Sequence, residues 1–248
     1  MKKLILHIPH SSTNIPFYDG YLFEKKQLDD EILKLTDWYT DELFFSKDDE
    51  MIVADFSRIF CDPERFEKNE DEPMFKKGMG VLYEKTDGNL EMRKIDSELR
   101  NKIIDNYYKP HHERLNNAVK EQLEKYGKAI IIDCHSLSDQ PFLRDNDQTT
   151  IRTNFSLGTD SFHTDTKLEK ITKDFFESCY GIVDINKPYE GTIVPMTFYK
   201  KNQNVQSIMI EVNRKLYLNP GTNIKNENFN SVKNNISSYL ELIREKFL

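Results

Sequence analysis

The sequence, 248 residues long, is short of cysteine, of glycine and of long apolar runs. Its three cysteines, Cys61, Cys134 and Cys179, are widely spaced and include no C-x-x-C pair. This pattern argues against a disulfide framework and a cysteine-ligated zinc site, and it favours a reducing compartment. No apolar run approaches the ~20 residues of a membrane-spanning helix, and the opening MKKLILHIPHSS is too short for a secretory core. We therefore expect a soluble, cytoplasmic protein.

Basic charge is also scarce, with 35 Lys and Arg against 42 Asp and Glu and a formal net charge of -7. A nucleic-acid binder needs a dense basic face to neutralise phosphates, so we expect no nucleic-acid partner and no membrane partner. A local basic pocket is still compatible with the first half of the chain, which contains Arg58, Arg65, Arg93, Arg100 and Arg114. No feature of the sequence indicates an oligomeric state.

The sequence is rich in material for a core, because 38% of its residues are hydrophobic and it has 16 Phe and 12 Tyr. A chain of this length forms one large α/β domain or two small ones. It has no internal repeat, no low-complexity block and no linker composition. We therefore expect a single domain over residues 1–248.

Short apolar runs alternate with stretches of helical periodicity. We expect strands at 3–8, 51–60, 129–137 (AIIIDCHSL) and 206–218 (QSIMIEVNRKLYL). We expect helices at 29–45, at 92–108 ended or kinked by Pro110, at 115–126 closed by Gly127, and at 229–248. The polar stretches 67–80 and 138–150 are expected to be loops. Near-continuously apolar strands between helices predict a mostly parallel sheet covered on both faces.

Polar side chains follow the ends of the expected strands. They are His7 and His10 after the first, Arg58 after the second, Asp133 and His135 at the third, and Glu211 and Arg214 at the fourth. Ligands of open parallel sheets bind outside the carboxyl ends of the strands. We therefore expect these side chains to converge.

His10, Asp37 and His135 form a set of two histidines and one carboxylate, which is a ligand set of hydrolytic zinc sites. Zinc polarises a carbonyl and lowers the pKa of water to about 7. Such a site needs a second carboxylate to move protons, and Glu211 is the candidate because a glutamate in so apolar a strand is costly unless it is paired.

Several of these residues have alternative interpretations. His7 is more simply a structural histidine, and Asp133 is equally well the cap of a turn. Asp37 and Asp41 lie one helical turn apart, so their carboxylates form either a solvated face or a cation site. Cys134, next to His135 in the sequence, is kept as an alternative functional residue.

A zinc-protease pattern is incomplete at YYKPHHERLN. His112 and Glu113 begin an H-E-x-x-H motif, but Asn116 stands where the second histidine is needed. His111 and His112 therefore either line a pocket or begin a helix.

Six blocks in order, HIPHSSTNIP, TDWYTDELF, SRIFCDPERF, YYKPHHERL, IIDCHSL and IMIEVNRKLYL, resemble the N-formylglutamate amidohydrolase family over about residues 6 to 218. The resemblance implies a zinc-dependent hydrolase that removes a formyl-type N-acyl group from an acidic amino acid such as N-formyl-L-glutamate. It also implies a three-layer α/β/α sandwich with a mostly parallel, mixed sheet, similar to the zinc carboxypeptidase and phosphorylase/hydrolase folds.

The related enzymes use a histidine, an acid, a second histidine and a late glutamate base, and His10, Asp37, His135 and Glu211 match that order. The resemblance implies one zinc ion, and other divalent metals suit the same donors. Related deacylases have an acidic ligand three residues after the first histidine, where this chain has Thr13. The acidic ligand is therefore placed at Asp37, with Asp41 as the fallback.

The resemblance also implies arginines for the substrate carboxylates, because arginine binds a carboxylate through two parallel hydrogen bonds. Arg58, Arg65 and Arg214 are the candidates. The family's Asp-x-Asn-Arg is Asp62-Pro63-Glu64-Arg65 here, and Ser12 replaces a glycine. Glu64 would repel an acidic substrate unless it is paired or points away. The alternatives are an amidase for another N-acyl amino acid or peptide, and a non-catalytic binding module on the same fold.

Overall fold

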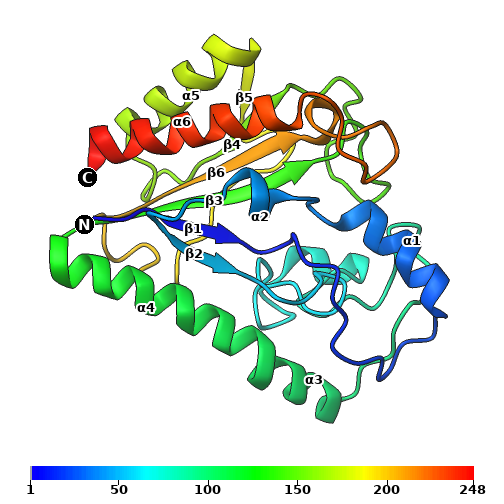
Figure 1. Ribbon diagram of the computed structural model, residues 1–248. Helices are drawn as coiled ribbons and strands as arrows, with labels where there is room; N and C mark the ends of the chain where they lie inside the picture. The colour runs from blue at the N-terminus through cyan, green and yellow to red at the C-terminus, as the bar shows by residue number, and fades with distance from the viewer. Residues whose placement is uncertain (1) are drawn as a thin grey trace.

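The computed structural model describes residues 2–248, which form a mixed, mostly parallel sheet (Figure 1). Across the described residues the six-stranded order is β2 (Glu50–Val53), β1 (Ile5–Ile8), β3 (Ala129–Leu137), β6 (Val205–Asn213), β4 (Phe155–Gly158) and β5 (Val183–Ile185). The first four strands are mutually parallel, whereas β4 is antiparallel to β6 and parallel to β5. The expected α/β class with a mostly parallel sheet is confirmed.

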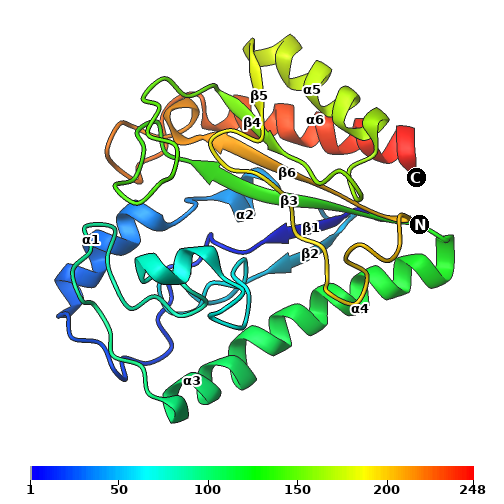
Figure 2. The same cartoon turned by 180° about the vertical axis from the view of Figure 1, so that it is seen from behind.

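Helices cover both faces of this sheet (Figures 1 and 2). One face packs on α4 (Lys109–Tyr126), where Ile5 shares a core with Leu115 and Val119. The other face packs on α5 (Thr166–Tyr180) and α6 (Phe229–Phe247), and Leu6 shares that core with Ile236. Alternate residues of a strand point to opposite faces, so the apolar strands supply both cores of a three-layer sandwich.

The first helical region differs from the expected single helix at 29–45. Helix α1 (Lys25–Leu35) ends at Thr36, which is extended, and α2 (Thr40–Leu43) starts after Tyr39, which is left-handed with φ of 62°. Asp37 lies in the turn between them, where its N–H donates to the His10 carbonyl at 3.0 Å. The prediction that Asp37 and Asp41 share a helical face is therefore wrong, and Asp37 is buried whereas Asp41 is exposed.

The second helical region is continuous through Pro110, where an end or a kink of the helix was expected. Helix α3 (Ser97–Ile103), capped by Asp96, leads through the π-helical segment η2 (Ile104–Tyr108) into α4. The wider π turns precede Pro110, which lies in the first turn of α4, a position that tolerates its missing N–H. The predicted stop at Gly127 is confirmed, since its φ is 72°.

Three further expectations differ from the structure. The strand expected at 51–60 ends at Val53, and Phe56 and Phe60 pack in a separate core with Tyr83. The strand expected at 206–218 ends at Asn213 and continues as the 3-10 turn η3 (Arg214–Leu216). A short 3-10 helix, η1 (Pro73–Lys77), lies in the expected loop 67–80. The segment 155–185, which holds β4, α5 and β5, was not predicted.

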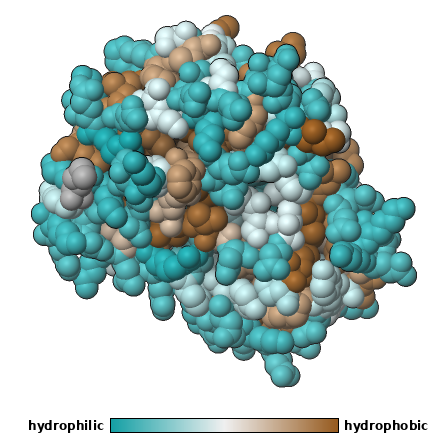
Figure 3. Space-filling view, viewed as in Figure 1, coloured by the Kyte–Doolittle hydropathy of each residue, from teal (hydrophilic) through white to brown (hydrophobic). Residues whose placement is uncertain are grey.

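The surface is polar. On the face shown in Figure 3 hydrophilic residues predominate, and the hydrophobic ones form scattered patches. None of the helices formed by residues 2–248 combines the length and the apolar character that crossing a bilayer requires.

Candidate active site

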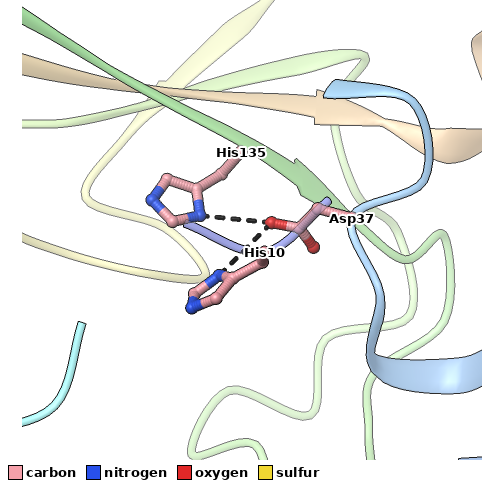
Figure 4. A group of neighbouring side chains, drawn as sticks. All are labelled: His10, Asp37 and His135. Atoms are coloured by element: carbon pink, nitrogen blue, oxygen red, sulfur yellow. Dashed lines mark hydrogen bonds and ion pairs between the residues drawn. The ribbon is translucent and has the colours of Figure 1, made fainter. Parts of the chain in front are cut away.

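His10, Asp37 and His135 meet at the carboxyl edge of the sheet (Figure 4). His10 follows β1, His135 lies near the end of β3, and Asp37 is presented by the turn between α1 and α2. Asp37 Oδ2 is 3.5 Å from His10 Nδ1 and 3.2 Å from His135 Nδ1. All three side chains are buried, with one potential ligand atom from each lying within 4.8 Å of the other two.

A buried carboxylate fixes the His10 ring. His10 Nε2 donates to Asp62 Oδ1 at 2.8 Å, because an ionised carboxylate can only accept. Burial alone would raise the pKa of Asp62, but the neighbouring charges of His10 and Arg58 hold that pKa well below its usual value. Tyr83 also donates to Asp62, at 2.6 Å. His10 Nδ1 is buried without a hydrogen-bond partner and lies toward Asp37.

His135 is held in the same way by Asp133. Its Nε2 donates to Asp133 Oδ1 at 3.0 Å, which leaves Nδ1 toward Asp37. The Ile193 N–H fixes the other oxygen, Oδ2, at 3.0 Å. A carboxylate behind each metal-binding imidazole is a recurrent feature of metal sites, since it sets both the tautomer and the ring orientation.

Arg214 holds Asp37. Its Nη2 donates to Asp37 Oδ1 at 2.9 Å, while Nε donates to Ser136 Oγ and Nη1 to the Lys34 carbonyl. Burial opposes ionisation of Asp37, but the neighbouring His10 and His135 imidazoles and the Arg214 charge keep its pKa well below the usual value. Asp37 is therefore an ionised carboxylate inside the protein.

Glu211 lies beside His135. The two residues are register partners of β6 and β3, so their side chains project from the same face of the sheet. Glu211 is 4% exposed, and its Oε2 atom has no hydrogen-bond partner. Burial raises the pKa of Glu211 to about 8, against the lowering influence of His135 and together with the raising charge of Asp37. This carboxyl group can hold or release a proton near neutral pH.

Two arginines border the centre with unused N–H groups. Arg58 Nη2 donates to Asp62 Oδ2 at 3.1 Å, and Arg65 Nε lies 3.7 Å from the same oxygen. The Nε atoms of both arginines are buried and have no hydrogen-bond partner. These donors suit an anionic ligand, whereas Arg214 already uses its three nitrogens on protein acceptors.

His7 belongs to a second group on the helix α4 side of the sheet. It is fully buried, with Nδ1 2.9 Å from Asp133 Oδ1 and 3.0 Å from Glu64 Oε1, and Nε2 2.9 Å from His111 Nε2. Burial alone would lower the pKa of His7, but Asp133 and Glu64 outweigh it and raise the pKa to about 9. Glu64 is therefore paired with His7.

The remaining candidates lie outside this centre. His112 donates from Nε2 to the Pro63 carbonyl at 3.0 Å and packs on Tyr108. Asp41 is not among the grouped ligand atoms of the described residues. Cys134 points into the opposite core, where its Sγ contacts the Ile132 carbonyl.

Sequence reasoning missed the supporting residues Asp62 and Tyr83. Asp62 stands in the block SRIFCDPERF, but nothing local shows that its carboxylate reaches a histidine 52 positions earlier. Tyr83 lies in a stretch without a motif, and only the fold brings its hydroxyl to Asp62.

Comparison with known proteins identifies the family of this chain and solved structures of similar fold. The family model described as N-formylglutamate amidohydrolase matches residues 2–218. An N-formylglutamate deformylase from Pseudomonas putida is 26% identical over 167 residues, which are 63% of this chain and 58% of that protein. This chain therefore spans less than two thirds of that relative's length.

Two solved structures have a similar fold. The crystal structure of an N-formylglutamate amidohydrolase from Ralstonia eutropha JMP134 superposes with a TM-score of 0.84 at 22% identity, covering 98% of this chain and 94% of that chain. A gene product from Agrobacterium tumefaciens superposes with a TM-score of 0.67 at 18% identity, covering 98% and 89%. Likeness at such low identity supports the fold.

Proposed function

The chain belongs to the N-formylglutamate amidohydrolase family, and we propose that it hydrolyses the amide of an N-acyl acidic amino acid, N-formyl-L-glutamate first among them. We propose that it does so as one domain over residues 1–248. We also propose that its fold is related to that of the zinc carboxypeptidases, as the resemblance implies. The observation that carries the proposal is the convergence of His10, Asp37 and His135 beside the unpartnered carboxyl of Glu211.

The donor set fits a divalent cation. His10 Nδ1 is a buried nitrogen without a hydrogen-bond partner, and Asp37 is ionised between two imidazole nitrogens. Two imidazoles and one carboxylate are a ligand set of hydrolytic zinc sites, and other divalent metals accept the same donors. A bound divalent cation would supply Lewis acidity to the substrate carbonyl and to the attacking water.

Proton transfer and the positioning of the ligands are assigned to residues of the chain. Glu211 takes a proton from the attacking water as its oxygen adds to the acyl carbon, and it passes that proton to the amine nitrogen as the C–N bond breaks. Arg214 positions Asp37 through their 2.9 Å contact, so we assign it this role in place of the substrate contact expected from sequence. His7, Asp133 and His112 lie behind the centre.

Arg58 and Arg65 are proposed to bind the carboxylates of the substrate. Their buried, unpartnered Nε atoms offer N–H donors beside the metal ligands. A carboxylate that accepts from such donors replaces the missing partners, and hydrogen bonds to charged groups contribute about 1.5–3 kcal/mol. This arrangement favours a small anionic substrate.

A deacylation screen tests the proposal. Zinc-loaded protein is offered formyl-, acetyl- and succinyl-glutamate with their glutamine counterparts. We expect turnover of N-formyl-L-glutamate and a loss of about 10²- to 10⁴-fold in kcat in Glu211→Gln with zinc content unchanged. Turnover only of the glutamine counterparts would move the function to another N-acyl amino acid. If zinc-loaded protein hydrolyses none of these compounds, the result would favour the alternative of a non-catalytic binding module.

A further inference from the structure

A second group of potential ligand atoms adjoins the first. His7 Nδ1, Glu64 Oε1 and Asp133 Oδ1 lie within 4.8 Å of one another. The imidazole nitrogen is 3.0 Å from the Glu64 oxygen and 2.9 Å from the Asp133 oxygen. In the site proposed above none of these three atoms binds the metal, and Asp133 Oδ1 only accepts from His135 Nε2.

The composition of this group calls for a positive charge. Two carboxylates converge on one side of a single, fully buried imidazole, and like charges at this distance repel each other in the interior. Apart from its 3.0 Å contact with His7 Nδ1, Glu64 Oε1 is buried without a hydrogen-bond partner. Donor atoms bound about 2.0–2.2 Å from one cation lie roughly 3–3.5 Å apart, and the two contacts of His7 fall near that spacing.

We propose that His7, Glu64 and Asp133 bind a second divalent cation next to the one held by His10, Asp37 and His135. One imidazole and two carboxylates are donors that zinc and manganese both accept. The inference rests on this cluster and does not require the proposed activity.

The surroundings are built for a cation at this place. His7 Nε2 lies 2.9 Å from His111 Nε2, and Arg114 Nη2 donates to His111 Nδ1 at 3.3 Å. His111 therefore holds the His7 ring with Nδ1 facing Glu64 and Asp133. The Ile193 N–H holds Asp133 Oδ2 at 3.0 Å, and the Glu64 side chain, 17% exposed, leaves a route from solvent.

Asp133 joins the two proposed sites. Its Oδ1 atom accepts from His135 Nε2 at 3.0 Å and faces His7 Nδ1 at 2.9 Å. A cation here would offset the charges of Glu64 and Asp133, and an acidic substrate could then approach despite the glutamate in the CDPERF block. The competing state is a protonated His7, which bridges the same two carboxylates without metal.

Zinc stoichiometry separates the two states. Chelator-stripped protein is titrated with Zn²⁺ by calorimetry, and the metal content is measured after gel filtration. We expect two zinc ions per chain for the wild type, one for Glu64→Gln, and two for the exposed control Glu70→Gln. His10→Ala should retain one ion, because it removes a ligand of the first site alone.

Three results would overturn the inference: one zinc per chain in the saturated wild type, two in Glu64→Gln, or none in His10→Ala. If Glu64→Gln does not fold, electron paramagnetic resonance of cobalt-loaded wild type decides the matter. Two neighbouring Co²⁺ ions give a spin-coupled signal, whereas uncoupled Co²⁺ at saturation contradicts the second site. Two zinc ions retained in His10→Ala would contradict the first site, in which His10 is a ligand, and not the second site.

Discussion

At the scale of single residues, the central feature is a buried carboxylate behind each of two histidines. Asp62 receives the Nε2 proton of His10, and Asp133 receives that of His135. Each pairing leaves Nδ1 toward Asp37. The two histidines could be proposed from sequence because they stand at strand ends, and Asp37 from the family resemblance. Their partners could not be proposed, because those contacts exist only in the fold.

Replacing Asp62 by asparagine tests this arrangement. Asp62→Asn removes the charge that orients His10, so we expect its zinc affinity to fall roughly 10- to 100-fold. Competition with a chromophoric chelator measures the change. Asp55→Asn, at an exposed carboxylate, should keep wild-type affinity. Equal affinities for both variants would show that Asp62 does not support the ligand.

Arg65 offers a second test at this scale. Because its Nε lies buried and unpartnered beside the centre, Arg65→Ala should raise KM for N-formyl-L-glutamate by roughly 10- to 100-fold, with a smaller effect on kcat. Steady-state kinetics measure both constants. Arg100→Ala, whose guanidinium contacts the Glu67 carbonyl, serves as the control. An unchanged KM in Arg65→Ala would remove Arg65 from the substrate pocket.

At the scale of elements, apolar runs and glycine stops predicted β1, β3, β6 and the end of α4, the elements that carry most of the site. The turn that presents Asp37 could not be predicted, since helical periodicity continues through it and the bond that fixes it joins Asp37 to His10, far away in sequence. Helix α5 was missed although Leu168, Thr172 and Phe176 recur at helical spacing on its buried side. Strand β5 has only three residues, and β4 mixes apolar residues with Ser156 and Gly158, so neither forms an apolar run like that of β1.

The end of helix α4 gives a prediction about an element. Gly127 has φ of 72° and a methyl group added there would meet nothing within 4 Å, so Gly127→Ala introduces backbone strain and no clash. We expect the free energy of unfolding to fall by about 1–2 kcal/mol in urea titrations. Gly88→Ala, where an added methyl group would meet only Thr86 Oγ1 at an ordinary 3.7 Å and φ is not left-handed, is the control and should leave the free energy of unfolding unchanged. Equal stability of the two variants would contradict this reason for the helix stop.

At the scale of the whole molecule, the site ties the ends of β1 and β3 to the α1–α2 turn, so a ligand held there binds the folded state alone. Zinc at about 100 times its dissociation constant should stabilise the protein by about 2.7 kcal/mol and raise Tm by roughly 5–10 °C. Scanning calorimetry with and without chelator measures the shift. Asp37→Asn should reduce it, whereas Asp41→Asn, at the exposed fallback position, should not. The opposite ranking would move the acidic ligand to Asp41.

The most direct measurement is anomalous diffraction at the zinc edge from crystals of the zinc-loaded protein. The account predicts a zinc peak bonded to His10 Nδ1, Asp37 Oδ2 and His135 Nδ1, next to the Glu211 carboxyl. Zinc-saturated crystals with these side chains ordered and no anomalous peak between them would contradict it.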